Sequence, residues 1–148
     1  METSIRDEFF GSLIWESLRE CWEGQMSLPD GLGSVRVFVG TPDPQHDQTV
    51  TLEARTAFTR LVTQHAVFAR KAADDLLAVH NEGWHHYENS PPLTSEQFQA
   101  RLTLEGIHVT SWGLATAYYD DGDLFWGHTI IVEQEDDGSF CGEAFFEG

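Results

Sequence analysis

The 148-residue sequence contains little positive charge: Lys and Arg together number 8, against 25 Asp and Glu, and the formal net charge is −17. Nucleic-acid binding needs Lys and Arg to displace counterions from phosphates, and anionic membrane surfaces attract basic segments in the same way. The composition therefore argues against nucleic acid and membrane as partners. A strongly acidic surface favours association with a basic protein instead.

Cysteine and long apolar runs are also scarce. Cys21 and Cys141 cannot build a disulfide framework, nor a zinc site, which needs about four ligands. No apolar run approaches the ~18 residues of a membrane span, and the first ten residues lack the features of a secretory signal. We therefore expect a cytoplasmic protein with reduced thiols and no cofactor.

Apolar residues are nevertheless plentiful, at 41% of the chain with five Trp, which excludes general disorder. The length suits one domain, so residues 1–148 are predicted to fold as a single unit. Charge is uneven along it, because no Lys or Arg follows Arg101. That acidic end is typical of either a solvated surface or a partner-facing patch.

Local patterns predict strands, then helices, then strands again. Period-two alternation indicates strands over 9–16, 22–28 and 34–39, with a turn at Pro29-Asp30-Gly31. Apolar residues then recur at helical spacing from Leu52 to about Gly83, with Thr63-Gln64-His65 as a possible break.

A second helix and four more strands complete the pattern. Thr94-Ser-Glu-Gln97 resembles a capping box and opens a short helix. Asp121-Gly122 and Asp137-Gly138 are hairpin signals. The strands expected around them cover 105–112, 114–119, 124–133 and 140–146. Together these elements predict an α+β domain: an antiparallel sheet of about seven strands, three N-terminal and four C-terminal, with two to three helices on one face.

Several motifs resemble a bacterial family of unknown function whose members carry a DGDLFWGH-x-I-x-V hairpin near the C-terminus. The matching segments are Phe10-Gly11, Trp22-Glu23-Gly24, Trp84, Phe98–Glu105, Asp120–His128 and Ala144-x-x-x-Gly148. The chain departs from the family at His85-His86-Tyr87, where an acidic stretch is commoner, and around Leu18-Arg19. The resemblance implies the architecture and a loose association with toxin–immunity loci. It implies no catalytic residues.

His128 is the best enzymatic candidate, and it supports the alternative hypothesis of a metal-dependent or histidine-based hydrolase. On a strand it would share a face with Leu124 and Trp126, where a hydrogen-bonded core histidine is the commoner outcome. Neither His80, His85 nor His86 has a partner at i, i+4, so no metal is predicted. The acidic turns lack the calcium-loop pattern and its twelfth-position glutamate.

Aromatic residues among the acidic turns favour a binding protein over an enzyme, since aromatic anchors with a charged rim are typical of tight interfaces. We therefore predict an immunity protein that occludes a cognate basic toxin, as a monomer or homodimer. A nucleic-acid mimic is a third possibility. The predicted partner-binding residues are Asp120, Asp121, Asp123, Glu135, Asp136, Asp137, Tyr119 and Trp112.

Overall fold

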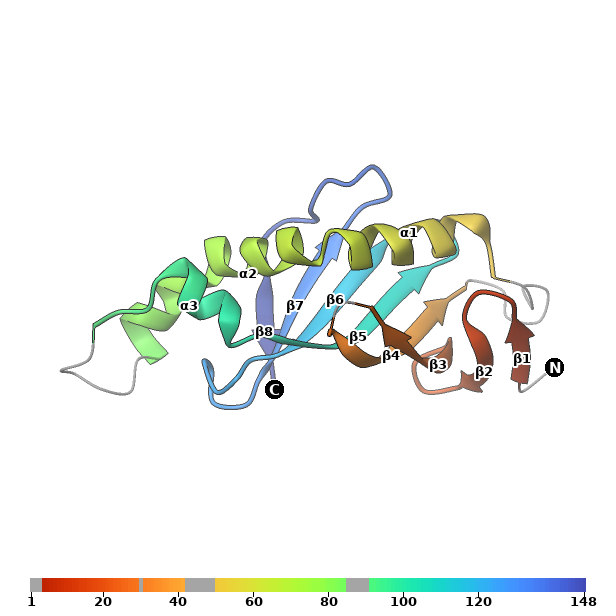
Figure 1. The fold of residues 1–148 in the computed structure, drawn as a ribbon, viewed down its shortest axis with the longest axis horizontal. Helices are drawn as coiled ribbons and strands as arrows, with labels where there is room; N and C mark the ends of the chain where they lie inside the picture. The colour runs from red at the N-terminus through yellow and green to blue at the C-terminus, as the bar shows by residue number, and fades with distance from the viewer. Residues whose placement is uncertain (1–3, 30, 42–49, 85–90) are drawn as a thin grey trace.

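The computed structural model describes residues 4–29, 31–41, 50–84 and 91–148 (Figure 1). Its elements, in chain order, are β1 (Ser4–Asp7), β2 (Gly11–Glu16), β3 (Cys21–Leu28), β4 (Gly33–Gly40), α1 (Leu52–Thr63), α2 (His65–Val79), a π-helical turn η1 (His80–Trp84), α3 (Ser95–Ala100), β5 (Thr103–Thr110), β6 (Ala115–Asp120), β7 (Thr129–Gln134) and β8 (Phe145–Glu147).

The eight strands form one sheet in simple chain order, β1 to β8. Every neighbouring pair is antiparallel except β4 and β5, which run parallel with Val37 opposite Ile107. A parallel pair needs a crossover connection, and the helices between β4 and β5 provide it. The predicted α+β class is confirmed. The sheet differs from expectation by the added strand β1, by this one parallel pair and by its last strand, which covers only Phe145–Glu147 instead of the predicted 140–146.

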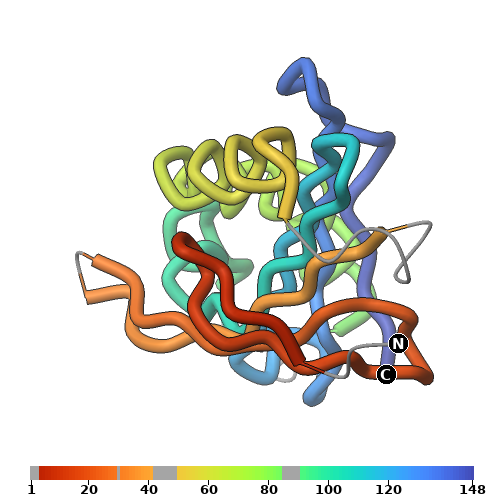
Figure 2. Tube along the Cα trace, turned by 90° about the vertical axis from the view of Figure 1, so that its right-hand side faces the viewer, coloured from red at the N-terminus to blue at the C-terminus, as the bar shows by residue number. Residues whose placement is uncertain are grey.

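The helices lie together on one face of the sheet, as predicted (Figures 1 and 2). Thr51 caps α1 by accepting a hydrogen bond from the Ala54 N–H at 3.2 Å. The break near residue 64 is real, since α1 ends at Thr63 and α2 begins at His65. The capping box at Thr94 and Gln97 is also present, with both reciprocal hydrogen bonds made.

The core fills the space between the helices and the sheet. One row of cross-strand neighbours, Val37, Ile107, Ala117 and Val132, is almost fully buried on the helix side. Phe58 of α1 and Phe68 of α2 are buried above the sheet. No helix in the described ranges is long and apolar enough to cross a membrane.

The sheet curves around the helices, so that the N-terminal strands lie at an angle to the C-terminal ones (Figure 2). Its other face, here called the open face, carries the alternate set of side chains. One row of this face runs through Phe38, His108, Thr116 and Glu133. Within the described residues, no helix lies on the open face.

Candidate protein-binding surface

The segment between β6 and β7 is an ordered loop built around one buried carboxylate. Asp121 has no exposed surface, and its Oδ1 accepts the Asp123 N–H at 2.9 Å. Its Oδ2 accepts three more backbone N–H groups, those of Phe125 at 2.9 Å, Gly127 at 3.1 Å and His128 at 3.0 Å. Four backbone donors on one carboxyl group hold the loop in a single path.

This loop corrects the prediction of a strand over 124–133 and a tight hairpin at Asp121-Gly122. The strand begins only at Thr129, because amides that a strand would give to its neighbour are donated to Asp121 instead. Asp123 and Trp126 adopt positive φ angles of 65° and 61°, a left-handed conformation that cannot continue a strand.

His128 follows the loop and is half-buried among aromatic rings rather than on a strand. Its Nδ1 contacts the Phe125 carbonyl oxygen, and its ring meets Trp84 and Phe146 edge-on, at 5.7 and 5.5 Å between centroids. No group of three or more His, Cys, Asp or Glu in the described part of the chain could hold a metal ion. His85 and His86 lie outside the described residues.

Two of the predicted partner-binding residues are inside the protein, so the prediction was wrong for them. Asp121 is the loop's internal acceptor and is fully buried. Tyr119 is 4% exposed on the helix side, where its hydroxyl donates to the His65 carbonyl at 3.4 Å. Burial raises the pKa of Tyr119 well above its ordinary value, in keeping with an interior phenol.

The other predicted residues are exposed, but they lie at opposite ends of the sheet. Asp120 ends β6 and Asp123 follows it, whereas Trp112 precedes its start. A strand of six residues spans about 20 Å. The two groups of residues therefore cannot both lie at the centre of one binding site. Glu135, Asp136 and Asp137 lie at the Trp112 end, in the turn after β7.

At this end the residues form a surface that we call the turn-end patch. It comprises Leu52, Glu53, Trp112, Glu135, Asp136 and Asp137. Leu52 and Trp112 expose 72% and 56% of their surface. The two turns touch at Gly113, where an added Cβ would lie only 2.9 Å from the Cβ of Asp136 and 3.8 Å from that of Glu53. A shallow cavity of about 280 Å³ lies between Leu52, Glu53 and Asp136.

Arg60 of α1 holds the two turns in place. Its guanidinium donates to Gln134 Oε1 at 2.7 Å and to the carbonyl oxygens of Gly113, Glu135 and Asp136 at 3.2, 3.0 and 3.3 Å. Arg60 binds backbone and amide oxygens and forms no ion pair with the three carboxylates of the turn, of which Asp137 accepts from Ser139 and Glu135 from the Cys141 thiol. All three residues are exposed.

Sequence reasoning missed Arg60, Leu52 and Glu53 as part of this surface. Arg60 lies 74 residues before Gln134, so no local spacing links them. A weak signal existed in Leu52, a large apolar residue next to the acidic first turn of a predicted helix. Its 72% exposure is visible only in the fold.

Comparison with known proteins gives one match, at the family level. Residues 7–143 match the model of a family described as an uncharacterised protein conserved in bacteria, DUF2262. The chain belongs to this family. The match covers the whole turn-end patch and confirms the predicted resemblance to a bacterial family of unknown function, while the link of DUF2262 to toxin–immunity loci stays a prediction. Neither the curated proteins nor the solved structures gave a match.

Proposed function

We propose that this DUF2262 protein is an acidic binding protein of the immunity type, which neutralises a basic bacterial toxin by direct occlusion. The observation that carries the proposal is the turn-end patch. Trp112 and Leu52 are exposed there as large apolar side chains, and the carboxylates of Glu53, Glu135, Asp136 and Asp137 are exposed in the same patch. A buried aromatic anchor inside a charged rim is the arrangement of an interface hot spot.

The two parts of the patch have different roles in this proposal. The rim carboxylates of Glu53, Glu135, Asp136 and Asp137 steer a basic partner and raise the association rate, which salt then screens. Trp112 buries its indole and sets the dissociation rate. Arg60 fixes both turns before the partner arrives, so little conformational entropy is lost on binding.

The charge distribution supports a basic partner. No Lys or Arg follows Arg101, so the last third of the chain is purely acidic. The guanidinium of Arg60, which contacts the turns of the patch, is occupied by four neutral oxygens. Toxins that act on nucleic acid carry basic surfaces for their phosphate contacts, and an acidic patch is complementary to such a surface.

The test is co-expression and calorimetry with the product of the neighbouring gene. We expect a stoichiometric complex of nanomolar or lower dissociation constant, about −12 kcal/mol, and restored growth where that product is toxic. The triple variant Glu135→Lys/Asp136→Lys/Asp137→Lys should slow association at least about tenfold and flatten its salt dependence. Trp112→Ala should mainly speed dissociation.

A matched control uses the acidic residues at the other end of the sheet. The double variant Asp120→Lys/Asp123→Lys also removes exposed carboxylates but lies about 20 Å from the patch. It should leave the dissociation rate unchanged and alter association only slightly. If the control weakens binding as much as the triple variant, the turn-end patch is not the interface. Absence of any complex overturns the proposed function itself.

A further inference from the structure

β3 is paired along its whole length on one side, but only over its first residues on the other. Its pairing with β4 continues to its last residue, Leu28. Its pairing with β2 ends at Glu23, which lies opposite Ile14. In the described part of the chain, no strand pairs with the outer edge of β3 from Gly24 to Leu28, and we call this segment the free edge. Unpaired strand edges can pair with another extended chain.

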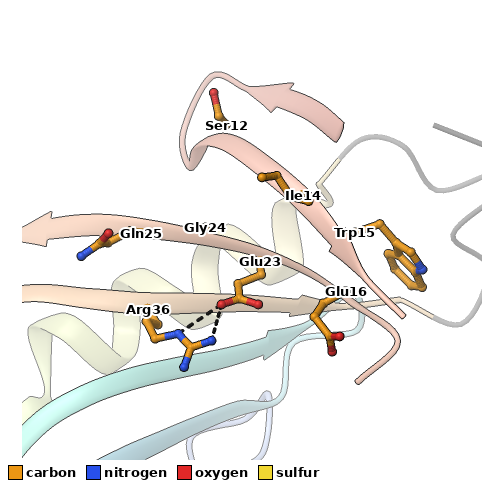
Figure 3. Close-up of a pocket in the computed structure, with 8 residues that line it drawn as sticks. All are labelled: Ser12, Ile14, Trp15, Glu16, Glu23, Gly24, Gln25 and Arg36. Atoms are coloured by element: carbon orange, nitrogen blue, oxygen red, sulfur yellow. Dashed lines mark hydrogen bonds and ion pairs between the residues drawn. The ribbon is translucent and has the colours of Figure 1, made fainter. Parts of the chain in front are cut away.

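The packing of β2 against the core explains why it leaves β3 at this point. Leu13 of β2 is fully buried, and an added Cβ at Gly24 would lie 2.7 Å from its Cδ2 and 2.9 Å from the Ser12 carbonyl oxygen. β2 therefore crosses over β3 at Gly24, where a residue with a side chain would collide with it. Beyond this crossing β2 diverges from β3 and pairs with β1 alone (Figure 3). The free edge is thus built into the fold.

The alternation of the ladder identifies which backbone groups the free edge presents. Cys21 closes the β2–β3 turn opposite Glu16, so Cys21 and every second residue after it direct their N–H and C=O groups towards the β2 side. On the free edge these residues are Gln25 and Ser27. Each offers one donor and one acceptor to an added strand. Pairing with them breaks no hydrogen bond between β3 and β4.

The free edge lacks the features that keep exposed strand edges from pairing. Proteins protect such edges with charged side chains, Pro or bulges. The segment Gly24-Gln-Met-Ser-Leu28 contains no charged residue and no Pro, and its register with β4 is unbroken. The two outermost strands of the sheet do carry charges, such as Arg6 on β1 and Glu147 on β8. The free edge is therefore open to pairing where the other edges are protected.

A hollow of about 560 Å³ lies beside the free edge, in the fork between β2 and β3 (Figure 3). Ile14 lines it with an apolar side chain that is 63% exposed, and Gln25 lines it from the free edge. Two carboxylates and two guanidinium groups balance each other at its margin, those of Glu16, Glu23, Arg36 and Arg6, the last through its contact with Ser12. The hollow therefore suits an uncharged side chain.

We propose that an extended peptide segment of another protein adds to the sheet along the free edge. Its backbone pairs with Gln25 and Ser27, and one uncharged side chain enters the hollow against Ile14. Backbone pairing provides affinity and the hollow provides specificity, as in other cases of strand addition. Gly24–Leu28 and the part of β4 before Arg36 form a two-stranded ribbon, which a third strand stabilises. The turn-end patch contains no residue of β3, so this proposal does not rest on the proposed function.

The test is selection from a displayed library of random short peptides on the wild-type chain, after removal of all peptides that bind the Ser27→Pro variant. Pro is tolerated on a strand edge and removes only the outward N–H of this residue. We expect peptides to remain, and their synthetic forms to bind Ser27→Pro at least about tenfold more weakly than the wild type in calorimetry. Ser27→Ala keeps the N–H and should bind like the wild type.

Hydrogen exchange of the wild-type chain gives a readout that needs no variant. The N–H groups of Gln25 and Ser27 should exchange rapidly in the free chain and become protected when a selected peptide is added. Ile14→Lys should weaken binding at least about tenfold, because an ammonium group then faces the uncharged side chain in the hollow. The control Val67→Lys changes an exposed apolar residue of α2, 49% exposed, and should have no effect.

Three outcomes overturn the proposal. One is that the wild type retains no peptide beyond those that bind Ser27→Pro. Another is that the selected peptides leave the Gln25 and Ser27 N–H groups unprotected. The third is self-association of the wild type, measured by sedimentation velocity, that Ser27→Pro abolishes, since a second copy of the chain would then occupy the free edge.

Discussion

The two acidic loops of the C-terminal half have nearly the same composition and opposite construction. The end of β6 and the start of the loop after it read Asp120-Asp-Gly-Asp123, and the turn after β7 contains Glu135-Asp-Asp-Gly138. In the first, a buried carboxylate organises the backbone from within. In the second, Arg60 organises the backbone from a helix, and the carboxylates face solvent.

This difference shows that acidic residues in a loop do not define its role. Asp121 collects four backbone donors, so its charge is used for folding and is not accessible to a partner. Asp136 contributes only its carbonyl oxygen to the fold, through Arg60, and leaves its side chain exposed. Whether a loop's carboxylates are accessible to a partner depends on the group that holds its backbone, which is Asp121 itself in the first loop and Arg60 in the second.

The largest expected effect is on the internally organised loop. Asp121→Ala leaves four amides without their acceptor, and hydrogen bonds to charged groups contribute about 1.5–3 kcal/mol each. We expect unfolding to become easier by at least about 4 kcal/mol, measured by urea denaturation. Asp121→Asn should lose about half of that, because its single side-chain oxygen can still accept the three N–H groups that Oδ2 binds, whereas its NH2 group cannot accept the Asp123 N–H.

The matched control is Asp123→Asn in the same loop. Asp123 is exposed and has a φ of 65°, which Asn tolerates well, so its stability should stay within about 0.5 kcal/mol of the wild type. If Asp121→Ala costs no more than this control, the loop is not organised by its carboxylate.

A smaller and more local effect is expected at the externally held turn. Arg60→Ala removes four hydrogen bonds at a half-exposed site, with an expected loss of about 2 kcal/mol. Arg60→Lys should recover less than half, since an ammonium cannot reach several separated oxygens. Hydrogen exchange should show reduced protection in residues 134–139 and unchanged protection in residues 121–128. Equal loosening of both loops would contradict the separation between them.

Much of the fold was predictable because it depends on local patterns. The helical stripe broken at residue 64 and the capping box at Thr94 are both present as predicted. The strand predicted over 124–133 begins only at Thr129. The backbone N–H groups of Phe125 and His128 donate to Asp121 instead of to a neighbouring strand. Asp121 lies three residues before Leu124, and strand propensity does not show how many backbone N–H groups its carboxylate binds.

The candidate site was predictable only in part, because it is assembled from distant segments. Trp112 and residues 135–137 were identified from their types, and the structure brings them together with Leu52. The contact depends on Arg60 reaching both turns across the helix–sheet interface. Asp120 and Asp123 were grouped with them because they are close in sequence, yet a full strand separates them.

The smallest expected effect concerns a single proton in the externally held turn. The Ser139 hydroxyl donates to Asp137 Oδ1 at 2.6 Å and the Ser139 N–H at 2.9 Å, and together they lower the pKa of Asp137 below its ordinary value of 3.8. A lowered folded-state pKa gives stability above the unfolded pKa, and this stability is lost as pH falls through the folded pKa.

Ser139→Ala removes the larger of these two causes and keeps the N–H. The pKa of Asp137, followed by carboxyl NMR titration, should therefore rise towards 3.8, and the pH window of its stabilisation should narrow. Ser17→Ala, in the exposed β2–β3 turn, should leave the Asp137 titration unchanged. An unmoved pKa in Ser139→Ala would mean that the Ser139 hydroxyl does not stabilise the Asp137 carboxylate, and that the backbone N–H of Ser139 is the donor that matters.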